Sequence, residues 1–266
     1  MTISLEKLVE VAREKTAADR LELSASDLAA RVADCGALER RGGRLVAALQ
    51  PKGIHVIAEV KGASPVAGRL RADYDPVAIA SEYQAAGAAA ISVLTEETYF
   101  GGSLAALESI AAAVDIPVLR KDFIVESYQL QQAALAGAAA VLLIAEVLTP
   151  AQLQELTAEA HALRLDALVE IHRSTSIPRA HAAGSGILGV NNRDLDTMEV
   201  DWHHAIDVAS DLPEATVLVA ESGLSSGAQL RQLHGAGYDA ALVGSSLMSA
   251  PEPGAALQTL LAEARS

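Results

Sequence analysis

The sequence is short of cysteine, aromatic residues and basic charge, and each shortage removes a class of protein. Cys35 is the only cysteine among 266 residues, which excludes an intrachain disulfide and a metal cluster built from cysteines. Aromatic residues make up only 3% of the chain, so its core must be built from Ala, Val, Leu and Ile. The formal net charge is −14 without a long basic block, which argues against nucleic-acid binding but leaves a small anionic substrate possible.

Long apolar segments are missing as well. The longest, residues 133–145, is rich in alanine and falls short of the ~18–20 residues that span a bilayer. Residues 1–6 lack a basic region followed by an apolar stretch, so we expect no secretion signal. We therefore expect a cytoplasmic protein without membrane partners, a monomer rather than an oligomer, built as one large α/β domain or two small ones.

Apolar runs typical of buried strands alternate with helical patterns from residue 55 onward. Eight runs are interpreted as strands, at residues 55–60, 90–94, 118–120, 140–144, 167–171, 187–190, 217–220 and 240–243. Strands that are apolar along their length are typical of parallel sheets buried on both faces. The pattern predicts a (β/α)8 TIM barrel. The rival, an open doubly wound sheet, is disfavoured because no Gly-x-Gly-x-x-Gly follows the first strand.

Residues 1–54 precede this barrel, at 55–266, and are predicted to form a helical extension within a single domain overall. An apolar face at helical spacing begins at Leu5, and Ser26 is suited to cap a second helix over 27–34 that ends at Gly36. Such an extension could cover the mouth of the barrel or plug its floor, and the sequence does not choose between them.

Two of the five lysines, Lys61 and Lys121, end apolar runs that are interpreted as strands. Elsewhere the chain prefers arginine, with fifteen Arg, and no lysine follows Lys121. Arginine stays protonated at any working pH, whereas a partly buried lysine can pass a proton. We interpret both as titratable amines of an active site; the alternative is two surface lysines at strand–loop junctions.

Charged and polar residues recur where the predicted strands end, the edge at which barrels of this class carry their active sites. They include Glu59, Lys61, Lys121, Glu170, His172, Asn191 and Glu221. His172 is expected to be a supporting or surface group. The Ser-Gly and Gly-Ser pairs after the last two strands predict a phosphate site made by backbone N–H groups. The chain's only two phenylalanines, Phe100 and Phe123, form either an apolar slot for a flat ring or a cap on the core.

Four segments, 56–65, 119–123, 189–195 and 220–223, together resemble indole-3-glycerol phosphate synthase of tryptophan biosynthesis. The resemblance covers essentially the whole chain, including a helical N-terminal extension. It implies a carbon–carbon lyase that converts 1-(2-carboxyphenylamino)-1-deoxyribulose 5-phosphate to indole-3-glycerol phosphate. Carbon dioxide and water are lost, and neither metal nor organic cofactor is used.

The resemblance also implies roles for individual residues. Lys121 would be the general acid, and Glu170 its partner in ring closure and dehydration. The catalytic group as a whole would comprise Glu59, Lys61, Lys121, Glu170, Asn191 and Ser222. The substrate would be bound by Ser64, Pro65, Phe100, Phe123, Arg193, Leu195, Glu221, Gly223, Leu242, Gly244 and Ser245.

The loop after the first strand departs from the family pattern, because Gly62 replaces an arginine and Val66 a serine. We expect this to alter loop closure or substrate release rather than the reaction. Two other functions stay open on the sequence. One is an aldolase that forms a Schiff base on Lys61 or Lys121, and the other is a phosphate-binding barrel without catalysis. Phosphate binding alone does not need both lysines together with Glu59 and Glu170.

Overall fold

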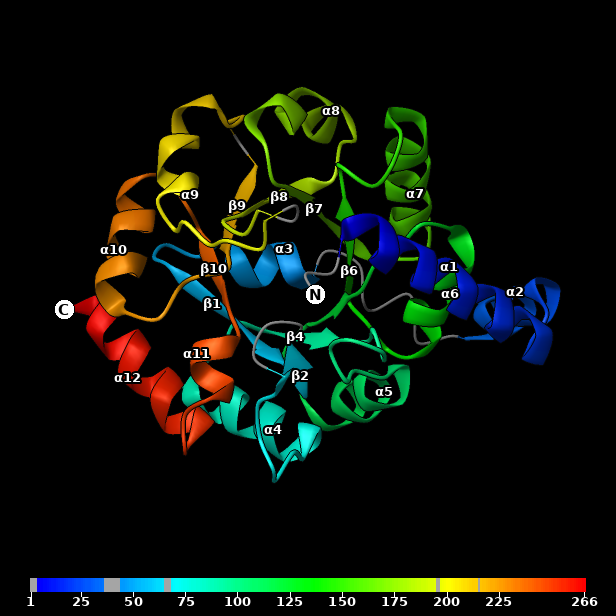
Figure 1. Cartoon of the computed structure of the whole chain (residues 1–266), viewed down its shortest axis with the longest axis horizontal. Coiled ribbons are helices and arrows are strands. Elements are labelled where there is room, and N and C mark those ends of the chain that lie inside the picture. The colour runs from blue at the N-terminus through cyan, green and yellow to red at the C-terminus, as the bar shows by residue number, and fades with distance from the viewer. Residues whose placement is uncertain (1–3, 36–43, 65–67, 195–196, 215) are drawn as a thin grey trace.

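The computed structural model describes residues 4–35, 44–64, 68–194, 197–214 and 216–266, and its centre is a closed barrel of eight parallel strands (Figure 1). Their order around the barrel is β1-β10-β9-β8-β7-β6-β5-β4, and β1 pairs with β4 to close it. The predicted (β/α)8 architecture is confirmed. The strands are β1 (His55–Val60), β4 (Ala90–Leu94), β5 (Val118–Lys121), β6 (Ala140–Ile144), β7 (Asp166–Ile171), β8 (Gly186–Asn191), β9 (Val217–Glu221) and β10 (Ala240–Val243).

Four of these strands have the predicted bounds, and the other four are longer by one or two residues. At the carboxyl end of the barrel the added residues are Lys121, Asn191 and Glu221, all polar. A hydrophobic pattern stops at the first polar residue, whereas the backbone ladder does not depend on the side chain. The extra residues therefore carry functional side chains into the mouth of the barrel on rigid strands.

Helices surround the barrel, and several are preceded by a residue whose side chain caps them. The Asp75 side chain accepts the backbone N–H groups of Val77 and Ala78 at 3.1 Å, and Thr149 forms a capping box with Gln152. The helices are α1 (Leu5–Glu22), α2 (Ala25–Asp34), α3 (Arg44–Leu49), α4 (Pro76–Ala86), α5 (Leu104–Ala113), α6 (Ser127–Leu135), α7 (Pro150–Ala162), α8 (Ile177–Ala182), α9 (His204–Asp207), α10 (Gly227–Gly235), α11 (Ser245–Met248) and α12 (Pro253–Arg265), with 3-10 turns at Ser174–Ser176 and Ala209–Asp211.

The N-terminal extension both reaches the mouth of the barrel and closes its floor, the two alternatives that the sequence left open. Leu8 of α1 reaches the mouth of the barrel, while Leu45 and Leu49 of α3 are fully buried against the barrel interior. The backbone N–H of Leu45 donates to Asp166 Oδ2 at 2.8 Å, and Asp166 is the first residue of β7, so α3 closes the floor. Figure 1 shows α3 across the centre of the barrel and α1 at its rim beside α6.

One detail of the extension was predicted wrongly. The second helix begins at Ala25 rather than Asp27, and its cap is Ser24, whose hydroxyl accepts the N–H of Asp27 at 3.2 Å. Ser24 and Ser26 stand two residues apart with equal capping chemistry, so the residue types alone do not single out the earlier one. Gly36, the predicted end of this helix, lies outside the described residues.

The loop after β1 folds into a small antiparallel hairpin, β2 (Ala63–Ser64) and β3 (Gly68–Arg69), that the strand pattern did not predict. It rests on the loop after β4, because the backbone N–H of Ala63 donates to the Phe100 carbonyl at 2.9 Å. A Cβ on Gly62 would lie 3.0 Å from the Gly101 carbonyl oxygen, so any larger residue requires this contact to loosen. Gly62 therefore allows the two loops to pack closely. Pro65 and Val66 lie outside the described residues.

The described helices include none that is long and apolar enough to cross a membrane.

Candidate active site

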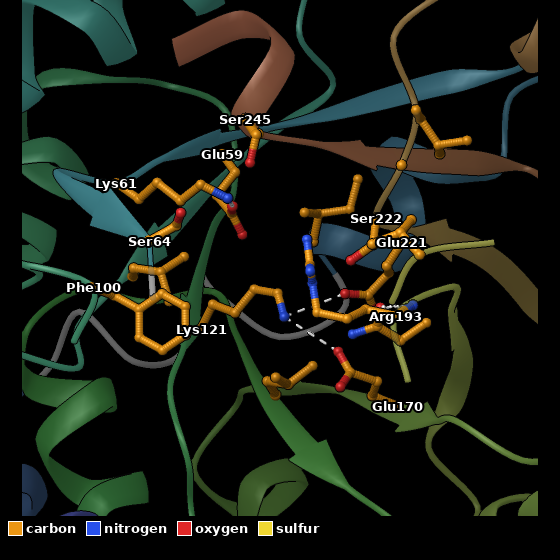
Figure 2. Close-up of a pocket in the computed structure, with 18 of the residues that line it drawn as sticks. Glu59, Lys61, Ser64, Phe100, Lys121, Glu170, Arg193, Glu221, Ser222 and Ser245 are labelled. Carbon is orange, nitrogen blue, oxygen red and sulfur yellow. Dashed lines mark hydrogen bonds and ion pairs between the residues drawn. The ribbon is translucent and has the colours of Figure 1, made fainter. Parts of the chain in front are cut away.

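A cavity of about 410 Å³ opens at the carboxyl ends of the strands, and it gathers every predicted site residue that the structure describes (Figure 2). Pro65 and Leu195 are the two predicted residues that lie outside the described part of the chain. The cavity is lined by Glu59, Lys61, Ser64, Phe100, Lys121, Phe123, Glu170, Asn191, Arg193, Glu221, Ser222, Gly223, Leu242, Gly244 and Ser245, together with residues that the sequence did not single out. The roles of these residues stay a prediction, but their convergence is a property of the fold.

Lys121 lies between two carboxylates. Its Nζ atom is 3.2 Å from Glu170 Oε2 and 3.3 Å from Glu221 Oε2, and both acidic side chains are almost fully buried (Figure 2). The three residues end β5, β7 and β9, alternate strands whose inward-facing side chains share one layer of the barrel. Burial alone would lower the pKa of Lys121, but the charges of Glu170, Glu221 and Glu59 raise it above its ordinary value. Lys121 is therefore an ammonium held ready inside an enclosed site.

The two carboxylates around this ammonium differ in protonation. Burial raises the pKa of both, but for Glu170 the positive charges of Lys121 and His172 outweigh it and hold the pKa low. For Glu221 the negative charge of Glu170 adds to the effect of burial, and its pKa is raised well above the ordinary value. Neighbouring carboxyls with opposite shifts can divide acid and base roles between them. Of the two, Glu170 is thus the stronger acid and the one that stays ionised more readily, and Glu221 is the one that holds a proton more readily.

A second lysine–carboxylate pair faces the first across the cavity. Lys61 Nζ lies 2.6 Å from Glu59 Oε1, and Figure 2 shows Ser245 beside this pair. Both residues belong to the end of β1, two positions apart and therefore on one face, as the sequence predicted. A Cβ on Gly244 would lie 2.3 Å from Glu59 Oε1, so the glycine after β10 makes room for the buried acid.

An apolar slot borders Lys121. The rings of Phe100 and Phe123 lie 6.3 Å apart at a tilt of 40°, an arrangement that leaves a flat surface beside the ammonium. Phe123 also belongs to a buried core cluster against which Phe100 packs, so these residues cap the core and line the cavity at once. Apolar side chains that the sequence did not single out complete the wall: Leu8, Leu94, Leu142, Ile144, Met198 and Val200.

The opposite end of the cavity presents backbone groups of two short loops. Ser222 and Gly223 both have a left-handed backbone, with φ of 68° and 76°, and Gly244 and Ser245 lead into α11. A Cβ on Gly223 would lie 2.5 Å from Val200 Cγ1, so only glycine fits under the loop that follows β8. These small residues leave N–H groups accessible to an anion. Ser225 and Ser246, which the sequence did not single out, line the same end.

The left-handed conformation of Ser222 predicts a trade between stability and activity. Relief of a non-glycine left-handed residue gains ~1–2 kcal/mol, from which the greater freedom of glycine in the unfolded chain subtracts ~0.5–1 kcal/mol. The second effect cancels only part of the first, so we expect Ser222→Gly to raise the free energy of unfolding in urea by ~0.5–1 kcal/mol. We also expect it to lower turnover through loss of the hydroxyl. Arg164→Gly is the matched control, since Arg164 has φ of 61° outside the cavity lining. It should stabilise the protein without changing turnover, and equal loss of activity in both variants would contradict the assignment.

Arg193 is held over the cavity by the loop that follows β8. Its backbone N–H donates to Asn191 Oδ1 at 3.0 Å, and its guanidinium donates to the Met198 carbonyl at 2.9 Å. Figure 2 shows the side chain pointing toward Lys121 and Glu221. Arg193 thereby places a guanidinium in the lining of the cavity.

His172 belongs behind the site rather than on the surface, which settles the alternative left open by the sequence. Its side chain is 5% exposed, and its Nε2 atom lies 3.1 Å from Glu170 Oε1. Glu146, in the turn after β6, contacts the other ring nitrogen, and the sequence analysis missed this residue. Glu146 lies two residues after the strand 140–144. Its neighbours on both sides are apolar, so no polar motif marked this position.

Among the described residues there is no group of three or more His, Cys, Asp and Glu side chains arranged to hold a metal ion. The expectation that the chain works without a cofactor stays a prediction.

Comparison with known proteins gives a consistent result. The profile of the family described as indole-3-glycerol phosphate synthase matches residues 5–260. The chain is 44% identical to the indole-3-glycerol phosphate synthase of Rhodopirellula baltica over 98% of this chain and 100% of that protein. It is 47% identical to that of Lactiplantibacillus plantarum, over 82% and 84% of the two chains. A Streptococcus mutans structure described as KGPDC shares the fold alone, with a TM-score of 0.61 and 12% identity over 80% of this chain and 98% of that one.

Proposed function

Because the chain belongs to the indole-3-glycerol phosphate synthase family, we propose that its cavity carries out that reaction with the residues described above. The enzyme is a carboxy-lyase of tryptophan biosynthesis, and its substrate is a phosphosugar joined to anthranilate. The proposed residue roles rest on one observation. Lys121 lies between Glu170 and Glu221, next to the slot formed by Phe100 and Phe123. A cation, a base and a flat apolar surface are what the first chemical step needs.

In ring closure, the aromatic carbon that bears the carboxylate attacks the ketone carbon, and a carbon–carbon bond forms. Phe100 and Phe123 hold the aromatic ring against this carbon, and the Lys121 ammonium donates a proton to the oxygen that becomes a hydroxyl. A positioned acid of this kind contributes ~100–10,000-fold to the rate. The same charge stabilises the developing alkoxide in a site largely closed to water.

Decarboxylation then breaks the bond between the ring and the carboxylate, and its electron pair restores the aromatic ring. Dehydration follows, in which the new hydroxyl leaves with a proton and the adjacent carbon of the five-membered ring loses one. The two lysine–carboxylate pairs, Lys121 with Glu170 and Lys61 with Glu59, supply a donor and an acceptor for these transfers. Lys121 and Glu170 are close enough that their titrations are properties of the pair rather than of single residues.

The N-terminal extension acts as part of the same catalytic unit in this proposal, so 1–54 and 55–266 form one domain. Its support is that α1 contributes Leu8 to the cavity and is fastened to α6, where the Tyr128 hydroxyl donates to the Leu23 carbonyl at 2.8 Å. We further propose a monomer in the cytoplasm without nucleic-acid partners, in keeping with the net charge of −14.

The reaction is tested by mixing purified protein with 1-(2-carboxyphenylamino)-1-deoxyribulose 5-phosphate and following indole fluorescence. Borohydride is added to a parallel sample, which is then analysed by mass spectrometry. We expect fluorescence to rise and no adduct to be trapped on the protein. An adduct at Lys61 or Lys121 would instead support the aldolase alternative, and substrate bound without any change would support a non-catalytic barrel.

The phosphate end is tested with Ser245→Asp. A carboxylate beside the phosphate adds like-charge repulsion of ~1–4 kcal/mol at ~4 Å, so we expect KM to rise about tenfold or more with a smaller change in kcat. Ser249→Asp, at the other end of α11 and outside the cavity lining, is the control and should leave KM unchanged. A Ser245→Asp enzyme with the parent's KM would mean that the phosphate binds elsewhere.

A further inference from the structure

Two buried charged side chains lie behind Glu170, outside the lining of the cavity, and the proposed reaction uses neither of them. His172 follows β7, and its Nε2 atom lies 3.1 Å from Glu170 Oε1. Glu146 follows β6, and its Oε2 atom lies 3.3 Å from His172 Nδ1. The backbone N–H of His172 also donates to Glu146 Oε1 at 3.1 Å. Glu146 therefore holds His172 at two points and turns its ring toward Glu170.

Charges alternate along this row, from Glu146 through His172 and Glu170 to Lys121. Burial by itself would lower the pKa of His172, but the carboxylates on both sides raise it to about 9. Burial would raise the pKa of Glu146, but hydrogen bonds from His172 and Ser176 outweigh it and hold the pKa below the ordinary value. Arg179 is the other cation facing this acid, with Nη2 at 3.9 Å from Glu146 Oε1. At neutral pH the imidazole is therefore a cation fixed against Glu170.

We infer that Glu146 and His172 are positioning residues, which keep Glu170 ionised and turned toward Lys121 during the reaction. The inference rests on the proposed role of Glu170 as a proton acceptor. Because His172 contacts Oε1 of Glu170, the oxygen that remains to exchange a proton is Oε2. Lys121 contacts this Oε2 atom at 3.2 Å. Neither positioning residue needs to touch the substrate.

Glu221 shows what happens to a buried carboxyl here without this support. It lies 3.3 Å from the same ammonium and is equally buried, yet it has no imidazole behind it among the described residues. Its pKa is raised well above the ordinary value, whereas that of Glu170 is lowered. An opposite charge within ~4–6 Å shifts a carboxyl pKa by about 1–3 units. Lys121 contributes most to holding the pKa of Glu170 low, and His172 adds a second positive charge, whereas Glu221 faces the negative charge of Glu170.

The test is the pH dependence of kcat in His172→Gln, which keeps a hydrogen-bonding side chain but carries no charge. With one cation removed, the pKa of Glu170 rises, so the acid limb of the kcat profile moves up by about one pH unit or more. The loss of kcat is consequently greater near pH 4.5 than at pH 8.5, because the shift returns the pKa of Glu170 toward its ordinary value of 4.5, while KM stays within a few-fold. An equal loss at both pH values, or none, overturns the inference, because a purely structural defect does not depend on the ionisation of Glu170.

Three further variants separate the possible causes. Glu146→Gln leaves the imidazole in place but weakens its charge, so the acid limb moves in the same direction by less; it also replaces His172→Gln should that variant not fold. His181→Gln, an exposed histidine on α8, is the control and leaves the profile unchanged. Glu170→Gln tests the proposed function itself. If it keeps full activity the role of Glu170 is wrong, and if it alone is inactive only the positioning inference fails.

Stability gives a readout that does not depend on turnover. The pKa of His172 in the folded protein, about 9, is above its ordinary value of 6.5. Its contribution to stability is therefore complete below pH ~6.5 and is lost as the pH rises through about 9. We expect the difference in unfolding free energy between the parent and His172→Gln to shrink from pH 6 to pH 9.5. A difference that stays constant would mean that His172 is not a cation in the folded protein.

Discussion

Replacing Lys121 with methionine is expected to lower kcat by about 100-fold or more, while substrate binding stays measurable. The methionine side chain matches the length of the lysine stem but can neither donate a proton nor stabilise an alkoxide. The phosphate contacts come from other strands and both phenylalanines are retained, so the variant should still bind substrate. Steady-state kinetics by indole fluorescence, with binding measured separately by calorimetry, distinguish the two effects. A variant that keeps kcat within a few-fold of the parent would dismiss Lys121 as the acid.

Lys121→Arg separates charge from proton transfer. Arginine keeps a positive charge between Glu170 and Glu221, but it does not release its proton at working pH. We expect it to bind substrate nearly as well as the parent and to remain severely impaired in turnover. If arginine restores activity, the role of the position is electrostatic rather than that of a general acid.

Gly189→Ala is expected to lower kcat by about 100-fold although residue 189 is outside the cavity lining, since a displacement of ~1 Å at a catalytic group has an effect of this size. A Cβ at this position would lie 2.4 Å from Glu221 Oε1 and 3.2 Å from Leu168 Cδ1. Glu221 is buried to 1% exposure, so its carboxyl has little room to retreat, and its contact with Lys121 is lost. The free energy of unfolding should also fall by ~1–3 kcal/mol, as is usual for overpacking.

Gly235→Ala is the matched control for this experiment. It lies in α10, and a Cβ there would meet no atom within 4 Å. Alanine is the better helix former, so stability should be unchanged or rise by up to ~1 kcal/mol, with turnover unaffected. A Gly189→Ala enzyme as active as this control would show that the position of Glu221 does not matter for the reaction.

The sequence was a good guide to the barrel and to the charged centre for the same physical reason. Parallel strands buried on both faces must be largely apolar, so their bounds stand out, and charged residues near their carboxyl ends mark where several of them reach the mouth. The parity of the strand then predicts that Glu59 and Lys61 face one way, which the structure confirms. The glycine and serine pairs were recognised because their chemistry suits an anion rather than a core.

The parts that the sequence did not predict depend on contacts between distant segments. Leu8 looks like any apolar residue of an amphipathic helix, and nothing local shows that it lines a cavity made by strands far along the chain. The same is true of Met198 and Val200, which come from a loop. Leu142 and Ile144 could have been found, because they share the inward parity of a predicted strand. Glu146 was missed because its partner, His172, follows a different strand.

The central claim is that this cavity itself performs ring closure, decarboxylation and dehydration. Its most direct test is a single-turnover experiment with purified enzyme in excess over 1-(2-carboxyphenylamino)-1-deoxyribulose 5-phosphate and a metal chelator present. Carbon dioxide and indole-3-glycerol phosphate are quantified in the same samples. The account predicts one equivalent of each per substrate with the parent, and neither on the same timescale with Lys121→Met. Substrate that binds the parent and is recovered unchanged would contradict it.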